Sequence, residues 1–140
     1  MAIVGFSFSK ILVERKAPIH KAIVNSKIDI NDVAKEEYEI EKGKQTLKID
    51  FGYLITYSPD LAVIEFKGHV LFLAEPKDAE IILKEWKKTG KIAKDFHMNL
   101  FNYIFQKCNI KALELGDEFN LPLHIQLPTI QISDKPIEKK

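Results

Sequence analysis

Two long segments of alternating apolar and polar residues, joined by a short turn, constrain the fold of this chain most strongly. Every second position is apolar or aromatic across residues 46–58, and residues 61–74 repeat the alternation. Ser58-Pro59-Asp60 has the chemistry of a turn, because proline presets φ while the flanking serine and aspartate can bond the local backbone. The pattern predicts two long half-buried strands joined as an antiparallel hairpin.

Two earlier segments, residues 6–15 and 26–32, also alternate and predict two more strands. The first ends in a run of apolar residues at positions 11–13, which indicates either a β-bulge or burial on both faces. The apolar positions that define these two strands are Phe6, Phe8, Ile28 and Ile30.

The apolar period changes at Pro76, which suits the first turn of a helix. Residues 77–88 have helical spacing, and Gly90 is a natural residue to follow the helix. A second helix is predicted over residues 91–115, with Gly116 ending it. This second helix carries a main apolar stripe and a second one beside it, formed respectively by Ile92, Phe96, Leu100, Ile104 and Cys108, and by Phe101, Phe105 and Ala112.

The order of elements, four strands followed by two helices, predicts an α+β domain with a four-stranded antiparallel sheet packed against two C-terminal helices. A chain of 140 residues is long enough for one such domain, which we expect to span residues 1–133, with a flexible polar tail at residues 134–140. A single cysteine and the lack of a signal-like or membrane-spanning segment favour a cytoplasmic protein without membrane insertion. The net charge of +1 gives no reason to expect nucleic acid as a partner.

Residues able to support catalysis are sparse in this sequence. There is no phosphate-binding loop, paired-cysteine motif or nucleophile-elbow motif, so we expect neither an enzyme nor a cofactor. Cys108 lies on the apolar stripe of the second helix, which favours a buried hydrophobic role over a reactive thiol. The histidines have no metal-ligand spacing and therefore predict no metal site; they are His20, His69, His97 and His124.

Apolar and aromatic residues exceed what one sheet and two helices need for a core. The surplus predicts a second subunit, an apolar binding groove, or both. Counting strand faces adds four aromatic residues to the candidate groove, namely Phe6, Phe8, Tyr53 and Tyr57. The same surplus is also compatible with a carrier of small apolar ligands or with a regulatory oligomer.

Several short motifs, in the same order along the chain, resemble the bacterial export chaperone family SecB. Residues 100–108, Leu-Phe-Asn-Tyr-Ile-Phe-Gln-Lys-Cys, are similar to the family's Leu-Phe-Pro-Tyr-Ala-Arg-Glu-Cys helix, with one extra residue before the cysteine. Residues 122–128 are similar to its Pro-x-Leu-x-Leu-Ala-Pro segment, with the same separation between prolines. Residues 27–30 resemble its Lys-Leu-Asp-Leu strand, and Ala17-Pro18 resembles the Ala-Pro after its first strand.

This resemblance implies a dimer of dimers that captures unfolded polypeptide clients in long apolar grooves without ATP. By the same resemblance Ile28 and Ile30 line the groove, and Glu65 matches a sheet glutamate that docks the translocase motor SecA. Lys16 stands where the family has an acidic residue, and the family's C-terminal docking tail is replaced by the different sequence of residues 134–140. The partner implied is therefore either such a motor or another protein, for example the antitoxin of a toxin module.

Overall fold

A computed structural model of the chain describes residues 2–92, 94–125 and 128. Its elements follow the order β1 (Ala2–Arg15), β2 (Ile23–Lys35), β3 (Gln45–Ser58), β4 (Ala62–Ala74), α1 (Pro76–Thr89) and α2 (Lys94–Glu118). The prediction of four antiparallel strands followed by two helices is therefore confirmed. The predicted domain limit at residue 133 and the tail over 134–140 lie outside the described residues.

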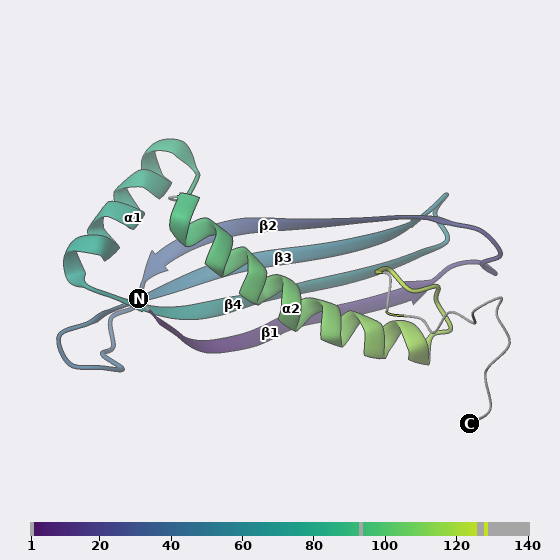
Figure 1. The fold of residues 1–140 in the computed structure, drawn as a ribbon, viewed down its shortest axis with the longest axis horizontal. Coiled ribbons are helices and arrows are strands. Elements are labelled where there is room, and N and C mark those ends of the chain that lie inside the picture. The colour runs from purple at the N-terminus through teal and green to yellow at the C-terminus, as the bar shows by residue number, and fades with distance from the viewer. Residues whose placement is uncertain (1, 93, 126–127, 129–140) are drawn as a thin grey trace, which may run out of the picture.

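The four strands form one antiparallel sheet in the order β1-β4-β3-β2, so the predicted hairpin of β3 and β4 lies at its centre (Figure 1). Tyr57 pairs with Ala62 beside the turn, and Gln45 pairs with Ala74 at the far end. β1 and β2 are the two edge strands, because each pairs with only one other strand of the described chain.

A β-bulge in β1 explains its irregular apolar pattern. The register with β4 shifts between Phe8 and Lys10, so Ser9 is the extra residue. Phe8 and Ile11 consequently face the same side of the sheet although they are three residues apart. The bulge, rather than burial on both faces, is thus the correct interpretation of this strand.

Gly68 on β4 allows β1 to approach closely. A Cβ atom at this position would lie 2.2 Å from the backbone oxygen of Ser7 and 3.0 Å from the ring of Phe51. Only glycine fits here without displacing backbone. The space beside Gly68 is filled by the Phe51 ring, which stacks on Phe6 with ring centroids 5.3 Å apart.

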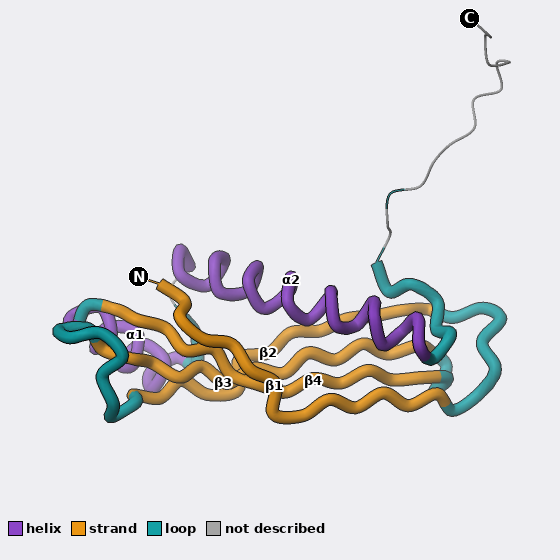
Figure 2. The backbone as a smooth tube through the Cα atoms, turned by 90° about the horizontal axis from the view of Figure 1, so that it is seen from below, coloured by secondary structure: helices purple, strands orange, loops and turns teal. Residues whose placement is uncertain are grey.

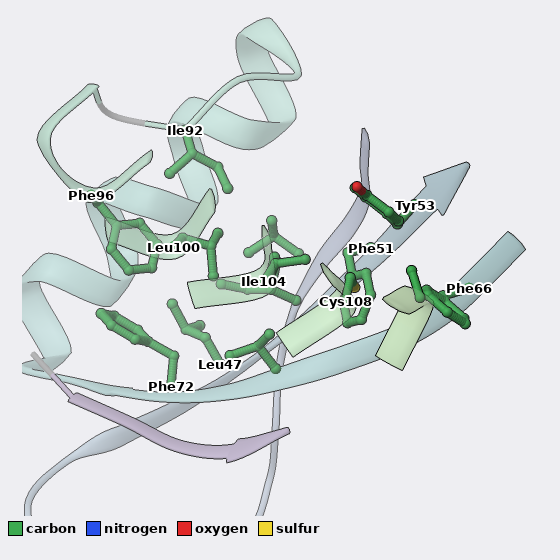
Figure 3. Packing of buried hydrophobic residues seen from close by; sticks show 14 of the residues in the cluster. Leu47, Phe51, Tyr53, Phe66, Phe72, Ile92, Phe96, Leu100, Ile104 and Cys108 are labelled. Carbon is green, nitrogen blue, oxygen red and sulfur yellow. The ribbon is translucent and has the colours of Figure 1, made fainter. Parts of the chain in front are cut away.

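α2 crosses one face of the sheet diagonally, whereas α1 lies beyond the β2 edge at one end (Figures 1 and 2). We call the covered side of the sheet the helix face and the other side the outer face. The main apolar stripe of α2 packs on the helix face above β3 and β4 (Figure 3). Four of its predicted residues lie on α2 and are buried, namely Phe96, Leu100, Ile104 and Cys108, and Ile92 is buried just before the helix begins.

The end of α2 differs from the sequence-based prediction. Gly116 is buried inside the helix, which continues to Glu118. Asn120 adopts a left-handed φ of 54°, its N–H donates to Asp117 O at 3.1 Å, and Leu121 N–H donates to Gly116 O at 2.8 Å. These two bonds form a Schellman motif in which asparagine takes the place that glycine usually holds.

Candidate functional site

An open hollow of about 480 Å³ lies where β2, the end of α1 and the start of α2 meet. We call it the β2 groove. Its apolar walls are Ile28, Ile30, Trp86, Ile92 and Phe101, and its polar side chains are Lys91 and His97. The volume is within the range of about 300–1,000 Å³ that is typical of ligand-binding clefts.

The groove exists because α2 leaves the β2 edge uncovered as it crosses the sheet (Figure 1). Alternation along β2 places Ile28 and Ile30 on the helix face, opposite Tyr53 and Phe51 of β3. The two isoleucines are only half-buried, whereas their partners on β3 are fully buried. β2 therefore supplies an apolar floor that remains accessible.

The turn between the helices forms the far wall of the groove. Gly90 ends α1 in a left-handed conformation with φ of 69°, and its N–H donates to Trp86 O at 2.8 Å. This cap turns the chain toward α2 and leaves Trp86 beside the hollow. On α2, the ring of His97 stacks on that of Phe101 with centroids 4.0 Å apart.

The outer edge of β2 adds backbone hydrogen-bonding capacity to this surface. Among the residues that the structure describes, β2 pairs only with β3, so its other edge carries unpaired N–H and C=O groups. An apolar groove beside a free strand edge suits an extended polypeptide, because side chains enter the groove while the edge can bond backbone.

A buried polar cluster lies between α2 and β3. The Tyr53 hydroxyl donates to Asn109 Oδ1 at 2.7 Å, and His124 Nε2 lies 2.7 Å from the same oxygen. Burial raises the pKa of Tyr53 to about 12 and lowers the pKa of His124 below its usual value, because both charged forms lose solvation. Both groups are therefore neutral near pH 7, and His124 donates to Asn109 in its Nε2-protonated form.

This cluster holds the segment that follows α2. Leu121 is buried, and the Tyr57 hydroxyl donates to Pro122 O at 2.7 Å. Sequence reasoning missed the cluster entirely. A single polar residue, Asn109, beside the buried Cys108 was the available signal, because a polar side chain next to an apolar stripe requires a partner.

The assignment of Tyr53 and Tyr57 to a binding groove requires correction. Both rings are only 1% exposed, and they form part of the core beneath α2. Each hydroxyl is engaged in a hydrogen bond within the chain. Face counting selected the correct face of β3, but this part of the face is covered by α2.

The structure does not bring Phe6 and Phe8 together with Ile28 and Ile30. The two phenylalanines lie on β1, at the opposite edge of the sheet from β2. The ring of Phe6 contacts the ring of Tyr103 on α2, with centroids 5.9 Å apart. It also contacts the ring of Phe8, with centroids 5.1 Å apart. They form a partly buried aromatic cluster rather than a wall of the β2 groove.

Glu65 lies on the outer face of the sheet, away from the β2 groove. Its carboxylate forms a salt bridge of 2.5 Å with Lys10, which lowers the pKa of Glu65 through this hydrogen bond. Lys67 lies two residues further along the same face. The proposed docking carboxylate is thus already paired within the chain, and its role in docking remains a prediction.

Across residues 2–92, 94–125 and 128, there is no group of three or more histidine, cysteine, aspartate or glutamate side chains that could hold a metal ion. Neither helix of the described chain is long and apolar enough to cross a membrane.

Comparisons with known proteins gave one kind of match. No family model and no curated protein sequence matches the chain. One solved structure similar to it is the Mycobacterium tuberculosis Rv1957 SecB-like chaperone in complex with a ChAD peptide from the Rv1956 HigA1 antitoxin. The two are 17% identical, with a TM-score of 0.48, over 97% of this chain and 92% of that chain.

Of the six predicted groove residues, Ile28 and Ile30 alone line the β2 groove. Two further groove residues, Trp86 and Phe101, were not predicted from the sequence to line it, although Phe101 was placed in the second apolar stripe of the second helix. Their positions depend on the turn at Gly90, which brings the end of α1 next to the start of α2.

Proposed function

We propose that this chain is an ATP-independent chaperone that holds unfolded or extended polypeptides in the β2 groove. The observation that carries the proposal is an open apolar hollow, lined by Ile28, Ile30 and Trp86, beside the unpaired edge of β2. Such a surface binds many sequences, because apolar contacts and backbone bonds impose little sequence preference. The motif resemblance to the SecB family supports the same function.

Binding in this groove involves no bond making or breaking, so the proposal includes no catalytic step. The polar side chains at the groove are Lys91 and His97, and His97 is stacked on Phe101. Their role in the proposal is to keep the rim of the groove hydrated.

The proposed active form is a homotetramer, a dimer of dimers, acting in the cytoplasm. Large apolar side chains that remain exposed on the protomer support assembly; on α2 they include Met98 at 60% and Ile110 at 67% exposure. The proposed physiological partner is an unfolded client, delivered to a motor or belonging to a toxin module.

Aggregation of a chemically unfolded client tests the proposal. The purified chain, mixed with the client as denaturant is diluted, is expected to suppress light scattering at near-stoichiometric ratios without ATP. Bovine serum albumin at equal mass is the control for non-specific crowding. Scattering that is unchanged at severalfold excess over the client contradicts the proposal.

The alternative, a carrier of small apolar ligands, uses the same hollow and is separated by a second measurement. Trp86 is the sole tryptophan of the chain and lines the groove, so its fluorescence reports occupancy. We expect an unfolded client to change Trp86 emission at micromolar concentration and a medium-chain fatty acid to leave it unchanged. The reverse pattern favours the carrier.

A further inference from the structure

The polar side chains that line the β2 groove are both of a basic type, Lys91 and His97. Asp29 also borders the hollow, but alternation along β2 turns its carboxylate to the outer face of the sheet. There the Asp29 carboxylate lies 3.5 Å from Lys27 Nζ. Among the residues that the structure describes, the groove therefore has no acidic side chain of its own.

A cluster of lysines lies at the wall of the groove that α1 forms. Residues 84–91, Lys-Glu-Trp-Lys-Lys-Thr-Gly-Lys, make up the end of α1 and the start of the turn that leads to α2 beside β2 (Figure 1). They include four lysines and one glutamate, although the whole chain carries a net charge of only +1. The positive charge is thus local to this end of the groove.

We call Lys87, Lys88 and Lys91 the lysine rim. All three side chains are exposed, and none of them forms a salt bridge within the described chain. Lys87 and Lys88 follow Trp86 directly, so they lie within about 3 Å of it along the axis of α1. A lysine can lay its apolar stem along such a surface while its ammonium group stays in water. The rim therefore places free cations next to the apolar walls of the groove.

The shape of the site favours an extended polypeptide as the occupant. The hollow is open, and it lies beside the edge of β2 that pairs with no other strand of the described chain. Ile28 and Ile30 can contact side chains at alternate positions of an extended segment, while the strand edge can bond its backbone. A fatty acid would use the apolar walls and the cations but not the strand edge.

We propose that the β2 groove selects extended client segments in which alternating apolar residues are flanked by aspartate or glutamate. This inference rests on the proposed function and adds a charge preference to it. The apolar residues enter the groove between Ile28 and Trp86, and the flanking carboxylates face the lysine rim. Each exposed ion pair contributes little, but several act together and also speed up encounter with an acidic segment.

A panel of three capped nine-residue peptides tests the preference in the full-length protein. The peptides share isoleucine at alternate central positions and differ only in their flanking residues, which are glutamate, glutamine or lysine. Binding is followed by the emission of Trp86, the sole tryptophan of the chain. At low salt we expect the glutamate peptide to bind at least about fivefold more tightly than the glutamine peptide, and the lysine peptide to bind more weakly than both. At 0.5 M salt the difference should fall below about twofold, because exposed charges are then screened.

The variant Lys87→Gln/Lys88→Gln/Lys91→Gln locates the preference. It is expected to bind the glutamate and glutamine peptides equally, with the affinity of the glutamine peptide unchanged. The matched control is Lys21→Gln/Lys42→Gln/Lys67→Gln, which removes the same charge at exposed lysines outside the groove and should keep the preference. Thermal unfolding of both variants verifies that they are folded.

The outcomes separate this inference from the proposed function. Peptide binding without a preference for glutamate overturns the inference and leaves the proposed function intact. A preference that survives removal of the lysine rim, or that is lost equally in the control, also overturns the inference. If no peptide binds, the inference and the proposed function both fail. A medium-chain fatty acid that then binds and requires the lysine rim would assign the groove to a small apolar ligand.

Discussion

The hydroxyl of Tyr53 and the side-chain oxygen of Asn109, 56 residues apart in sequence, are joined by a buried hydrogen bond of 2.7 Å. This bond connects the centre of the sheet to α2 and, through His124, to the segment after α2. A tyrosine that we expected to contact a client is instead a fixed point of the core. The accessible apolar surface consequently begins one strand further out, at Ile28 on β2.

Replacing Tyr53 with phenylalanine is expected to destabilise the fold by about 0.5–1.5 kcal/mol, because the hydrogen bond to Asn109 is lost while Asn109 Oδ1 still accepts from His124. Client capture should be unchanged at temperatures where the variant is folded, since Tyr53 does not line the groove. Urea unfolding measures the loss of stability, and Tyr38→Phe, at a residue that is 52% exposed, is the control. If the variant has unaltered stability but captures the client more weakly, Tyr53 contacts the client and this prediction is wrong.

Alternation along the strands was sufficient to predict the sheet and the face that each side chain occupies. Ile28 and Tyr53 were both assigned to the apolar face, and both lie on the helix face. Their different exposures depend on the order of the strands and the diagonal path of α2, because β3 lies at the centre of the sheet beneath the helix and β2 lies at its edge. Neither the strand order nor the path of α2 can be predicted from the alternation within a single strand.

The polar cluster between α2 and β3 could not be predicted from the sequence, because it also depends on the path of the chain. His124, Asn109 and Tyr53 meet only after α2 ends and the chain turns back at Asn120. The predicted helix end at Gly116 was wrong, because a single glycine within a helix costs only about 1 kcal/mol and the later Asn120 supplies the left-handed residue that ends the helix. Without the correct end, the return of the segment to Asn109 could not be predicted.

Replacing Ile28 and Ile30 together with serine is expected to weaken client capture by about tenfold or more, because the floor of the groove becomes polar. The fold should survive, since both side chains are half-buried and lose less than the roughly 2–5 kcal/mol of a truncated core residue. Light scattering and thermal unfolding are measured on the same protein.

The matched control for this variant is Ile23→Ser/Ile81→Ser, at isoleucines that are 69% and 60% exposed and lie outside the groove. Capture by the control should equal that of the unmodified chain. A large fall in the melting temperature or in the oligomeric mass of Ile28→Ser/Ile30→Ser would instead show that the two isoleucines belong to the core.

The thiol of Cys108 is expected to react slowly in the native protein. It is completely buried, and burial raises its pKa to about 12, so the reactive thiolate is rare at neutral pH. Labelling by an aromatic disulfide reagent should be more than about 100-fold slower in buffer than in denaturant. Since this is the sole cysteine, the signal is unambiguous, and rapid native labelling would indicate an accessible thiol.

Assembly is expected to depend on the outer side of α2. Met98 and Ile110 are 60% and 67% exposed, on the side of the helix opposite its buried stripe. Replacing both with glutamate should lower the mass measured by sedimentation at micromolar concentration, because the charges oppose burial in an interface. Phe119→Glu, at a residue 39% exposed beyond the helix end, is the comparison. A monomeric mass for the unmodified chain contradicts the prediction of a tetramer.

Acidification is expected to destabilise the fold through His124. Burial holds the pKa of His124 below the 6.5 of a free histidine, so between the two values the unfolded chain binds more protons than the folded chain. The free energy of unfolding is therefore not reduced by this group above pH 6.5. It declines as the pH falls from 6.5 to the pKa of His124 in the folded chain. Asp117 lines the hollow next to His124, but burial is the cause of the lowered pKa.

Urea unfolding between pH 7.5 and 5.5 measures this decline in the unmodified chain and in His124→Gln. Glutamine can donate to Asn109 without titrating, so the variant isolates the contribution of the imidazole. The difference in unfolding free energy between the two proteins should shift in favour of the variant as the pH is lowered. A difference that is constant over this range would place the His124 ring in solvent and would contradict its hydrogen bond with Asn109.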